Sequence, residues 1–144
     1  MAQKSGLKVT RKYTTPGNPY NNIEWEKRSS KITNPDGSVV FEMNDVEIPS
    51  TWSQVATDIM VSKYFRKAGV PQTDADGNVL KDENGDVVLG PETSSRQVFD
   101  RLAETWRHWG EKTGYFATKA DAQSFEDELK YLSLIHISEP TRPY

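Results

Sequence analysis

The stretch SSRQVFDRLAETWRHWG, Ser94–Gly110, decides the fold class because it carries the start, the apolar face and the end of an amphipathic helix. Ser94 and Gln97 have the spacing of a capping box, in which a hydroxyl and an amide satisfy unpaired N–H groups. Gly110 is predicted to end the helix. One apolar face, expected to pack in a core, contains Val98, Phe99, Leu102, Ala103, Trp106 and Trp109.

Two further helices are predicted on either side of this one. Upstream, Thr51–Gln54 fits a second capping box, and Gly69 and Pro71 are expected to end that helix. Its apolar stripe comprises Trp52, Val55, Ala56, Ile59, Met60 and Tyr64. Downstream, a third helix is predicted to begin at Thr118, with an inward face formed by Ala122, Phe125 and Leu129.

The segment before the first helix has the pattern of β-structure. Lys31–Thr33 and Ser38–Phe41 flank the turn sequence Asn34–Gly37, which predicts a β-hairpin. Val46–Ile48 alternates and is predicted to be a third short strand, stopped by Pro49. The predicted fold is α+β and mainly helical: an N-terminal β-hairpin followed by about three amphipathic helices with a turn-rich insertion.

The insertion covers residues 72–92 and is predicted to be a surface hairpin or ordered loop. Its carboxylates at Asp74 and Asp76, followed by Asn78, suggest a calcium loop. An EF-hand needs glycine at the sixth position, whereas Gly77 stands at the fourth. Tight turns are therefore the better interpretation.

The first 22 residues are polar and are predicted to be a flexible, extended or irregular arm preceding a domain at 23–131. The arm carries four cations without an acid among them, and a solvated tail is favoured over a phosphate-binding role. These cations are Lys4, Lys8, Arg11 and Lys12.

Composition narrows the function classes. The chain has 144 residues and a net charge of −3, which does not suggest a nucleic-acid protein. It contains no cysteine, which excludes thiol chemistry and cysteine-ligated metal sites within the sequence given. There is no apolar run of ~18 residues and no signal peptide, so no membrane partner is expected and the cytoplasm is the default compartment.

Candidate catalytic groups are few, and each has a simpler explanation. His108 lies off the apolar face of its helix and is expected to be solvated. Asp100 with Glu104, and the run Glu126–Glu128, are expected on exposed helix faces. No glycine-rich phosphate loop occurs. The residues alone therefore assign no catalytic, cofactor-binding or metal-binding residue, and leave open a small binding or adaptor module that uses exposed aromatic side chains.

The C-terminal segment 132–144 is predicted to differ in origin from the rest, and the alternative is a natural, mildly apolar tail. The run Leu132–Arg142 reads as the in-frame translation of a transposase sequencing adapter, which predicts an artefact joined to a truncated chain. Its apolar residues Leu132–Ile137 are nevertheless expected to prolong the third helix, stopping before Pro140. Deleting 132–144 is expected to leave the packing of Trp52, Trp106 and Phe125 intact.

From about Leu7 to Tyr131 the order of segments resembles the N-terminal region of the adenosylcobalamin-dependent, class II ribonucleotide reductases. The specific parts are Trp25–Arg28, Trp52–Gln54 together with Ser62–Arg66, and Gly114–Phe116 before the third helix. Residues 72–92 look like an insertion particular to a subgroup.

The resemblance implies a parent enzyme that reduces ribonucleotides, with diphosphates as the expected substrates. In that family, adenosylcobalamin generates a thiyl radical on a barrel cysteine, a cysteine pair supplies electrons, and thioredoxin-type proteins restore the thiols. All those residues lie in an α/β barrel absent from this sequence, so none is carried over. The implied partners are the missing barrel, a ribonucleotide substrate, a nucleotide effector and the reductant. No cofactor is expected to bind this fragment, which is expected to be inactive alone.

Overall fold

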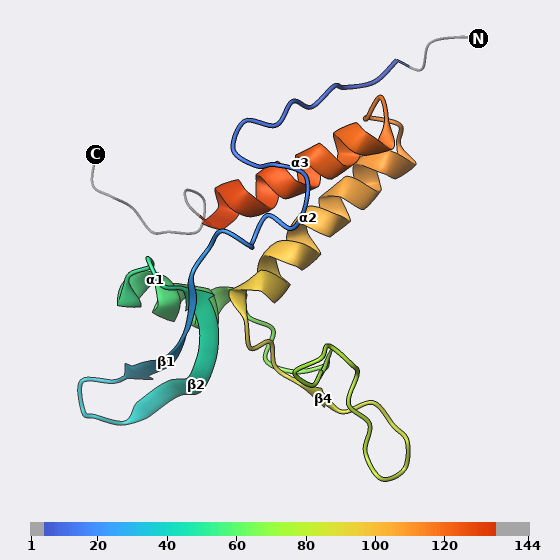
Figure 1. Cartoon of the computed structure of the whole chain (residues 1–144). Coiled ribbons are helices and arrows are strands. Elements are labelled where there is room, and N and C mark those ends of the chain that lie inside the picture. Colours follow the sequence, from blue (N-terminus) through green and yellow to red (C-terminus); the bar gives the residue numbers. More distant parts are fainter. Residues whose placement is uncertain (1–4, 135–144) are drawn as a thin grey trace.

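The computed structural model describes residues 5–134, which form a twisted β-hairpin with a short helix against it and a long helical hairpin standing above (Figure 1). The predicted α+β class, a β-hairpin followed by three helices, is confirmed. The elements are β1 (Trp25–Thr33), β2 (Val39–Pro49), α1 (Gln54–Ile59), the π-helix η1 (Met60–Tyr64), β3 (Val70–Pro71), β4 (Leu89–Gly90), α2 (Ser95–Lys112) and α3 (Lys119–Leu132).

β1 and β2 pair in antiparallel fashion around the predicted turn, where the backbone N–H of Asn34 donates to the Ser38 carbonyl at 2.8 Å. The prediction of a separate third strand at Val46–Ile48 is wrong, because these residues are the second half of β2 and pair with Glu26–Arg28. The two halves join at Asp45, whose φ is 56°, where the strand register shifts. Such a bulge bends a strand without ending it.

The first helix begins later and ends earlier than predicted. Ser53, not Thr51, is its N-cap, and its side chain accepts from the Ala56 N–H at 3.1 Å. The helix widens into η1 and stops at Phe65, which is extended and buried. A π-turn shifts the direction of the chain, and here it carries Phe65 into the core. Gly69 therefore does not end the helix.

The other two helix starts are confirmed. Ser94 and Gln97 form the complete capping box, and Thr118 caps α3 by accepting the Asp121 N–H. The predicted end at Gly110 is wrong, since α2 continues to Lys112; a Cβ on Gly110 would lie 2.5 Å from the Phe116 ring, so the glycine permits close packing. At 18 residues α2 is the longest helix, and no helix within residues 5–134 combines the length and apolarity needed to cross a membrane.

The core lies where the β-hairpin, α1–η1 and the first half of α2 meet. Trp52 and Phe99 pack edge to face there, with ring centroids 6.0 Å apart. Val98 and Ala103 of the predicted α2 face are buried, but Trp106 and Trp109 are exposed, as are Val55, Ile59 and Tyr64 of the first stripe; these core assignments are wrong. The buried cluster comprises Tyr20, Val46, Ile48, Trp52, Ala56, Met60, Val61, Phe65, Val98, Phe99 and Leu134.

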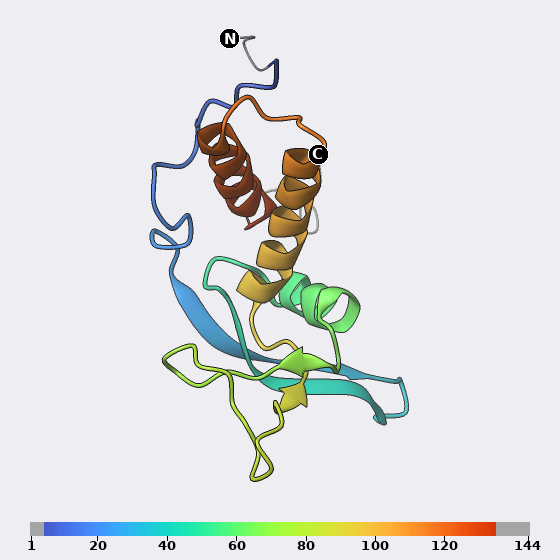
Figure 2. The same cartoon turned by 90° about the vertical axis from the view of Figure 1, so that its right-hand side faces the viewer.

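The insertion projects from the body as two short turns, and its base is closed by the pairing of β3 with β4 (Figure 2). Within it, Asp74 Oδ1 accepts backbone N–H groups from Asp76 and Asn78, each at 2.9 Å. Asp82 repeats the arrangement with Asn84 and Asp86. The predicted tight turns are confirmed, and these aspartates hold their own backbone.

Candidate functional site

The N-terminal arm lies along α3 and is held there by carboxylates of that helix (Figure 1). The Val9 N–H donates to Asp121 at 2.9 Å, and Arg11 pairs with Asp127 at 2.7 Å. The backbone N–H groups of Lys12 and Tyr13 both donate to Glu128. The arm is irregular, as predicted, but the expectation of solvated cations is wrong for Arg11.

The expectation that Glu126–Glu128 is exposed is also wrong, since the three side chains are almost completely buried and Asp127 is 2% exposed. Helical periodicity reveals an apolar face, but it cannot show that an irregular segment covers a polar face. The signal available in the sequence was complementarity: an arm with cations and no acids, and a helix with three consecutive acids.

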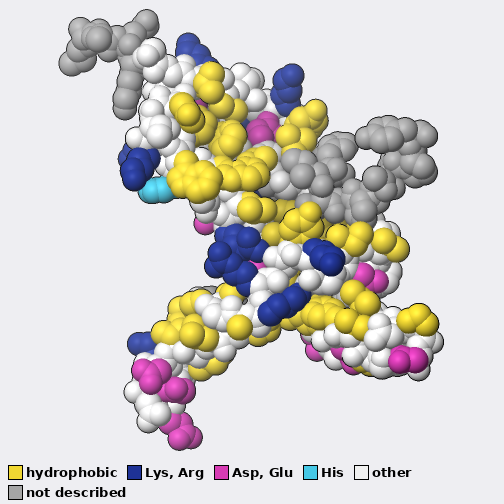
Figure 3. All heavy atoms as spheres, turned by 180° about the vertical axis from the view of Figure 1, so that it is seen from behind, with side chains coloured by type: hydrophobic (Ala, Val, Ile, Leu, Met, Phe, Trp, Pro, Cys, Tyr) yellow, Lys and Arg dark blue, Asp and Glu magenta, His cyan; other side chains and the backbone are white. Residues whose placement is uncertain are grey.

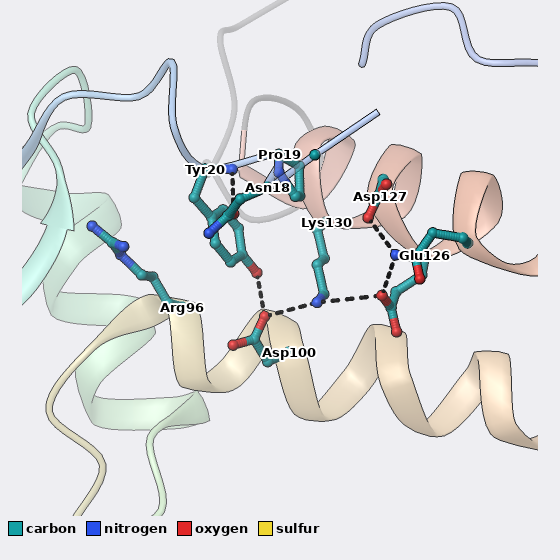
Figure 4. Close-up of a pocket in the computed structure, with 10 residues that line it drawn as sticks. Asn18, Pro19, Tyr20, Arg96, Asp100, Glu126, Asp127 and Lys130 are labelled. Atoms are coloured by element: carbon teal, nitrogen blue, oxygen red, sulfur yellow. Dashed lines mark hydrogen bonds and ion pairs between the residues drawn. The ribbon is translucent and has the colours of Figure 1, made fainter. Parts of the chain in front are cut away.

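A polar cleft of about 350 Å³ lies between Gly17–Tyr20 of the arm and the facing sides of α2 and α3 (Figure 4). The Tyr20 hydroxyl donates to Asp100 at 2.8 Å. Lys130 Nζ lies 3.1 Å from Asp100 and 3.6 Å from Glu126. The cleft therefore contains a continuous chain of alternating donors and acceptors that links the arm to both helices.

The electrostatics fix the protonation states in this chain of groups. Burial, reinforced by the charge of Asp100 and its hydrogen bond, raises the pKa of Tyr20 well above its ordinary value. Burial alone would lower the pKa of Lys130, but the carboxylates of Asp100, Glu126 and Glu104 outweigh it and raise that pKa. At neutral pH the phenol is protonated and the amine is charged, so neither is a base or a nucleophile. The cleft therefore fastens the arm to both helices through paired groups.

Other candidate groups lie apart from the cleft. His108 is exposed on α2, as predicted. Asp100 and Glu104, predicted to be surface residues, are partly exposed but serve as partners of Lys130. Within the described part of the chain, no three histidine or acidic side chains gather in a way that could hold a metal ion.

An exposed aromatic face is the second feature that stands out. Trp106 and Trp109 are 43% and 58% exposed although they continue the stripe that contains buried Val98. Tyr115, just past the end of α2, is also exposed. Hydrophobic side chains gather over this end of the molecule when it is seen from behind (Figure 3). Large aromatic side chains left exposed in this way are a candidate interaction surface.

The comparisons with known proteins identify the family. A family model described as class II vitamin B12-dependent ribonucleotide reductase matches residues 26–136. The chain belongs to this family. It is 44% identical to the vitamin B12-dependent ribonucleotide reductase of Agrobacterium fabrum over 95% of its own length, and 44% identical to that of Streptomyces coelicolor over 91%. It spans 12% of the length of each of these two reductases.

Family membership confirms the resemblance drawn from the sequence, and the structure shows what the segments quoted for that resemblance do. Arg28 donates to the carbonyl oxygens of Ser50 and Trp52, which joins two of these segments. Gln54 donates to the Ser29 carbonyl at 2.9 Å and strengthens the same junction. Phe116, in a third segment, packs on Phe125 with centroids 5.2 Å apart. In the described part of the chain, these residues support packing.

Proposed function

We propose that the chain is the non-catalytic N-terminal region of a ribonucleotide reductase that converts ribonucleoside diphosphates to deoxyribonucleotides by adenosylcobalamin-initiated radical chemistry. The observation that carries the proposal is membership of the class II family over a segment that spans 12% of the Agrobacterium fabrum reductase. The cleft supports it, because the charged groups around Lys130 pair with one another. By itself the chain is inactive.

We infer that cobalamin binds outside the residues described. The cleft is lined by ion-paired side chains and by the arm, and His108 stands exposed on the outside of α2. The cofactor, the nucleotide substrate and effector, and the thioredoxin-type reductant are therefore assigned to the remainder of the enzyme. We place the enzyme in the cytoplasm, where cysteine pairs are kept reduced.

The test is to recover the uninterrupted gene, extend the reading frame past Tyr131 and assay the product. We expect a long barrel domain with a radical cysteine and a reducing pair, and adenosylcobalamin-dependent reduction of CDP. A stop codon within a few codons, or no reduction of any ribonucleotide, would overturn the proposal. Reduction of CTP with no reduction of CDP would overturn its diphosphate part alone.

A further inference from the structure

The apolar stripe of α2 is one continuous surface with two different environments. Val98, Leu102 and Trp106 follow one another at intervals of four residues, and Trp109 follows three later, so all four lie on one side of the helix. Val98 is buried and Leu102 is partly buried, whereas both tryptophans are exposed. The stripe is apolar along its whole length, but its first half is buried and its second half is exposed.

The covering changes because α2 extends beyond the body that it packs on. The first turn of α2 is fixed to β2, where Ser94 Oγ donates to Glu47 Oε1 at 2.8 Å and Ser95 Oγ donates to the Glu47 carbonyl at 3.2 Å. From there the helix rises away from the hairpin alongside α3 (Figures 1 and 2). Its contact with the α3 side is made by another face, through Gly110 against Phe116. Within residues 5–134 the second half of the stripe stays exposed, by 43% at Trp106 and 58% at Trp109.

The composition of this second half is that of a protein interface. Tryptophan and tyrosine are enriched among residues that dominate binding energy, and they are usually ringed by polar groups. The ion pair of 2.7 Å between Arg107 and Glu111 lies instead on the side of α2 that faces α3, where Arg107 also donates to Gln123. Tyr115, 63% exposed, adds a third aromatic side chain just past the helix end, where its N–H donates to the Gly110 carbonyl at 2.9 Å.

We propose that the tryptophan face, defined as Trp106, Trp109 and Tyr115, docks the catalytic remainder of the same polypeptide. This inference rests on the proposed function. The apolar stripe of α2 that packs in the core of this domain continues into the exposed half of the helix. This continuation is expected if the exposed half packs against a neighbouring domain. The related reductases supply that neighbour, since this chain spans only 12% of the Agrobacterium fabrum enzyme. The net charge of −3 does not suit a nucleic acid as the partner.

The experiment uses a full-length chimera in which residues 1–134 replace the matching segment of the Agrobacterium fabrum reductase. A photo-crosslinking benzoyl-phenylalanine stands at position 106 or 109, and at Val40 of the hairpin, 61% exposed, in the control. We expect positions 106 and 109 to cross-link to peptides of the catalytic remainder and position 40 not to. Cross-links only between two copies of the chain, or none at either tryptophan, would overturn the inference.

A paired substitution gives a second readout. We expect Trp106→Ala with Trp109→Ala to speed protease cleavage between the two parts of the chimera at least about 30-fold, the effect of losing one strong interface residue. Val40→Ala should leave the rate unchanged. The outcomes distinguish a failure of the proposed function from a failure of the proposed docking face. A chimera inactive while the parent reductase is active counts against the proposed function. An active chimera whose cleavage rate ignores the tryptophans overturns only the docking face.

Discussion

The indole Nε1 of Trp52 donates a hydrogen bond of 2.8 Å to the backbone carbonyl of Leu134. The two residues are 82 positions apart, and both are buried in the core. The contact contradicts the expectation that deleting 132–144 leaves the packing of Trp52 intact. The adapter origin of this segment remains a prediction, and Ile135–Tyr144 lie outside the described residues. Whatever encodes it, Leu134 fills a core position.

Replacing Leu134 with alanine is therefore expected to lower the free energy of unfolding by about 2–5 kcal/mol, because it removes buried methyl groups and leaves a cavity beside Trp52. Urea titration followed by tryptophan fluorescence measures the change. Leu80→Ala in the exposed insertion is the matched control and should cost less than about 0.5 kcal/mol. Equal effects of the two substitutions would contradict the packing of Leu134.

The ion pair between Arg11 and Asp127 should hold the arm on α3. Because Asp127 is buried, we expect Arg11→Ala to lower the free energy of unfolding by about 1–3 kcal/mol and to speed amide hydrogen exchange at Val9 and Tyr13. Glu111→Gln breaks the more exposed pair with Arg107 and should change stability by less than about 1 kcal/mol, without affecting the arm. Unchanged exchange at Tyr13 in Arg11→Ala would count against this role.

Alkaline pH should loosen the same region through Tyr20 and Lys130. The pKa of each is raised in the folded protein, so their contribution is complete below about pH 10 and is lost as pH rises above it. Each group that releases its proton on unfolding makes the free energy of unfolding decrease with pH by up to about 1.4 kcal/mol more per pH unit. Unfolding free energies between pH 9 and 12 measure the slope.

Tyr20→Phe should reduce the slope of the unfolding free energy against pH by the amount that corresponds to about one proton, since phenylalanine cannot ionise. The exposed Tyr64→Phe is the control and should retain the steep slope. If Tyr20→Phe and the unsubstituted chain lose stability in parallel above pH 10, the assigned role of the Tyr20–Asp100 hydrogen bond is wrong.

Gly110→Ala should destabilise the chain even though alanine favours helices by about 1 kcal/mol. The new Cβ would lie 2.5 Å from Cε2 of Phe116, and relief of that clash must separate α2 from the α2–α3 turn. We expect a net cost of about 1–3 kcal/mol by thermal unfolding. Thr105→Ala on the exposed face of α2 is the control. It also introduces the helix-favouring alanine but no clash, so it should be neutral or slightly stabilising. A stabilised Gly110→Ala variant would show that the ring moves freely.

Local sequence signals predicted the elements where chemistry within a few residues decides the outcome. The Ser94–Gln97 capping box, the Thr118 cap and the Asn34–Gly37 turn all stand where the sequence places them. Each depends on side chains that bond to backbone in their own turn, so distant contacts are not needed. Family membership was likewise readable from local segments such as Trp25–Arg28.

The sequence by itself determined the α+β class, the order of the elements and the family. Only the tertiary structure decided which apolar residues are core and which acidic residues are buried. Trp106 has the same helical spacing as Val98, but the hairpin body covers one and ends before the other. Asp127 looks like surface charge until the arm brings Arg11 to it from 116 positions away. Burial depends on what lies across from a side chain, and that is set by contacts between segments far apart in the chain.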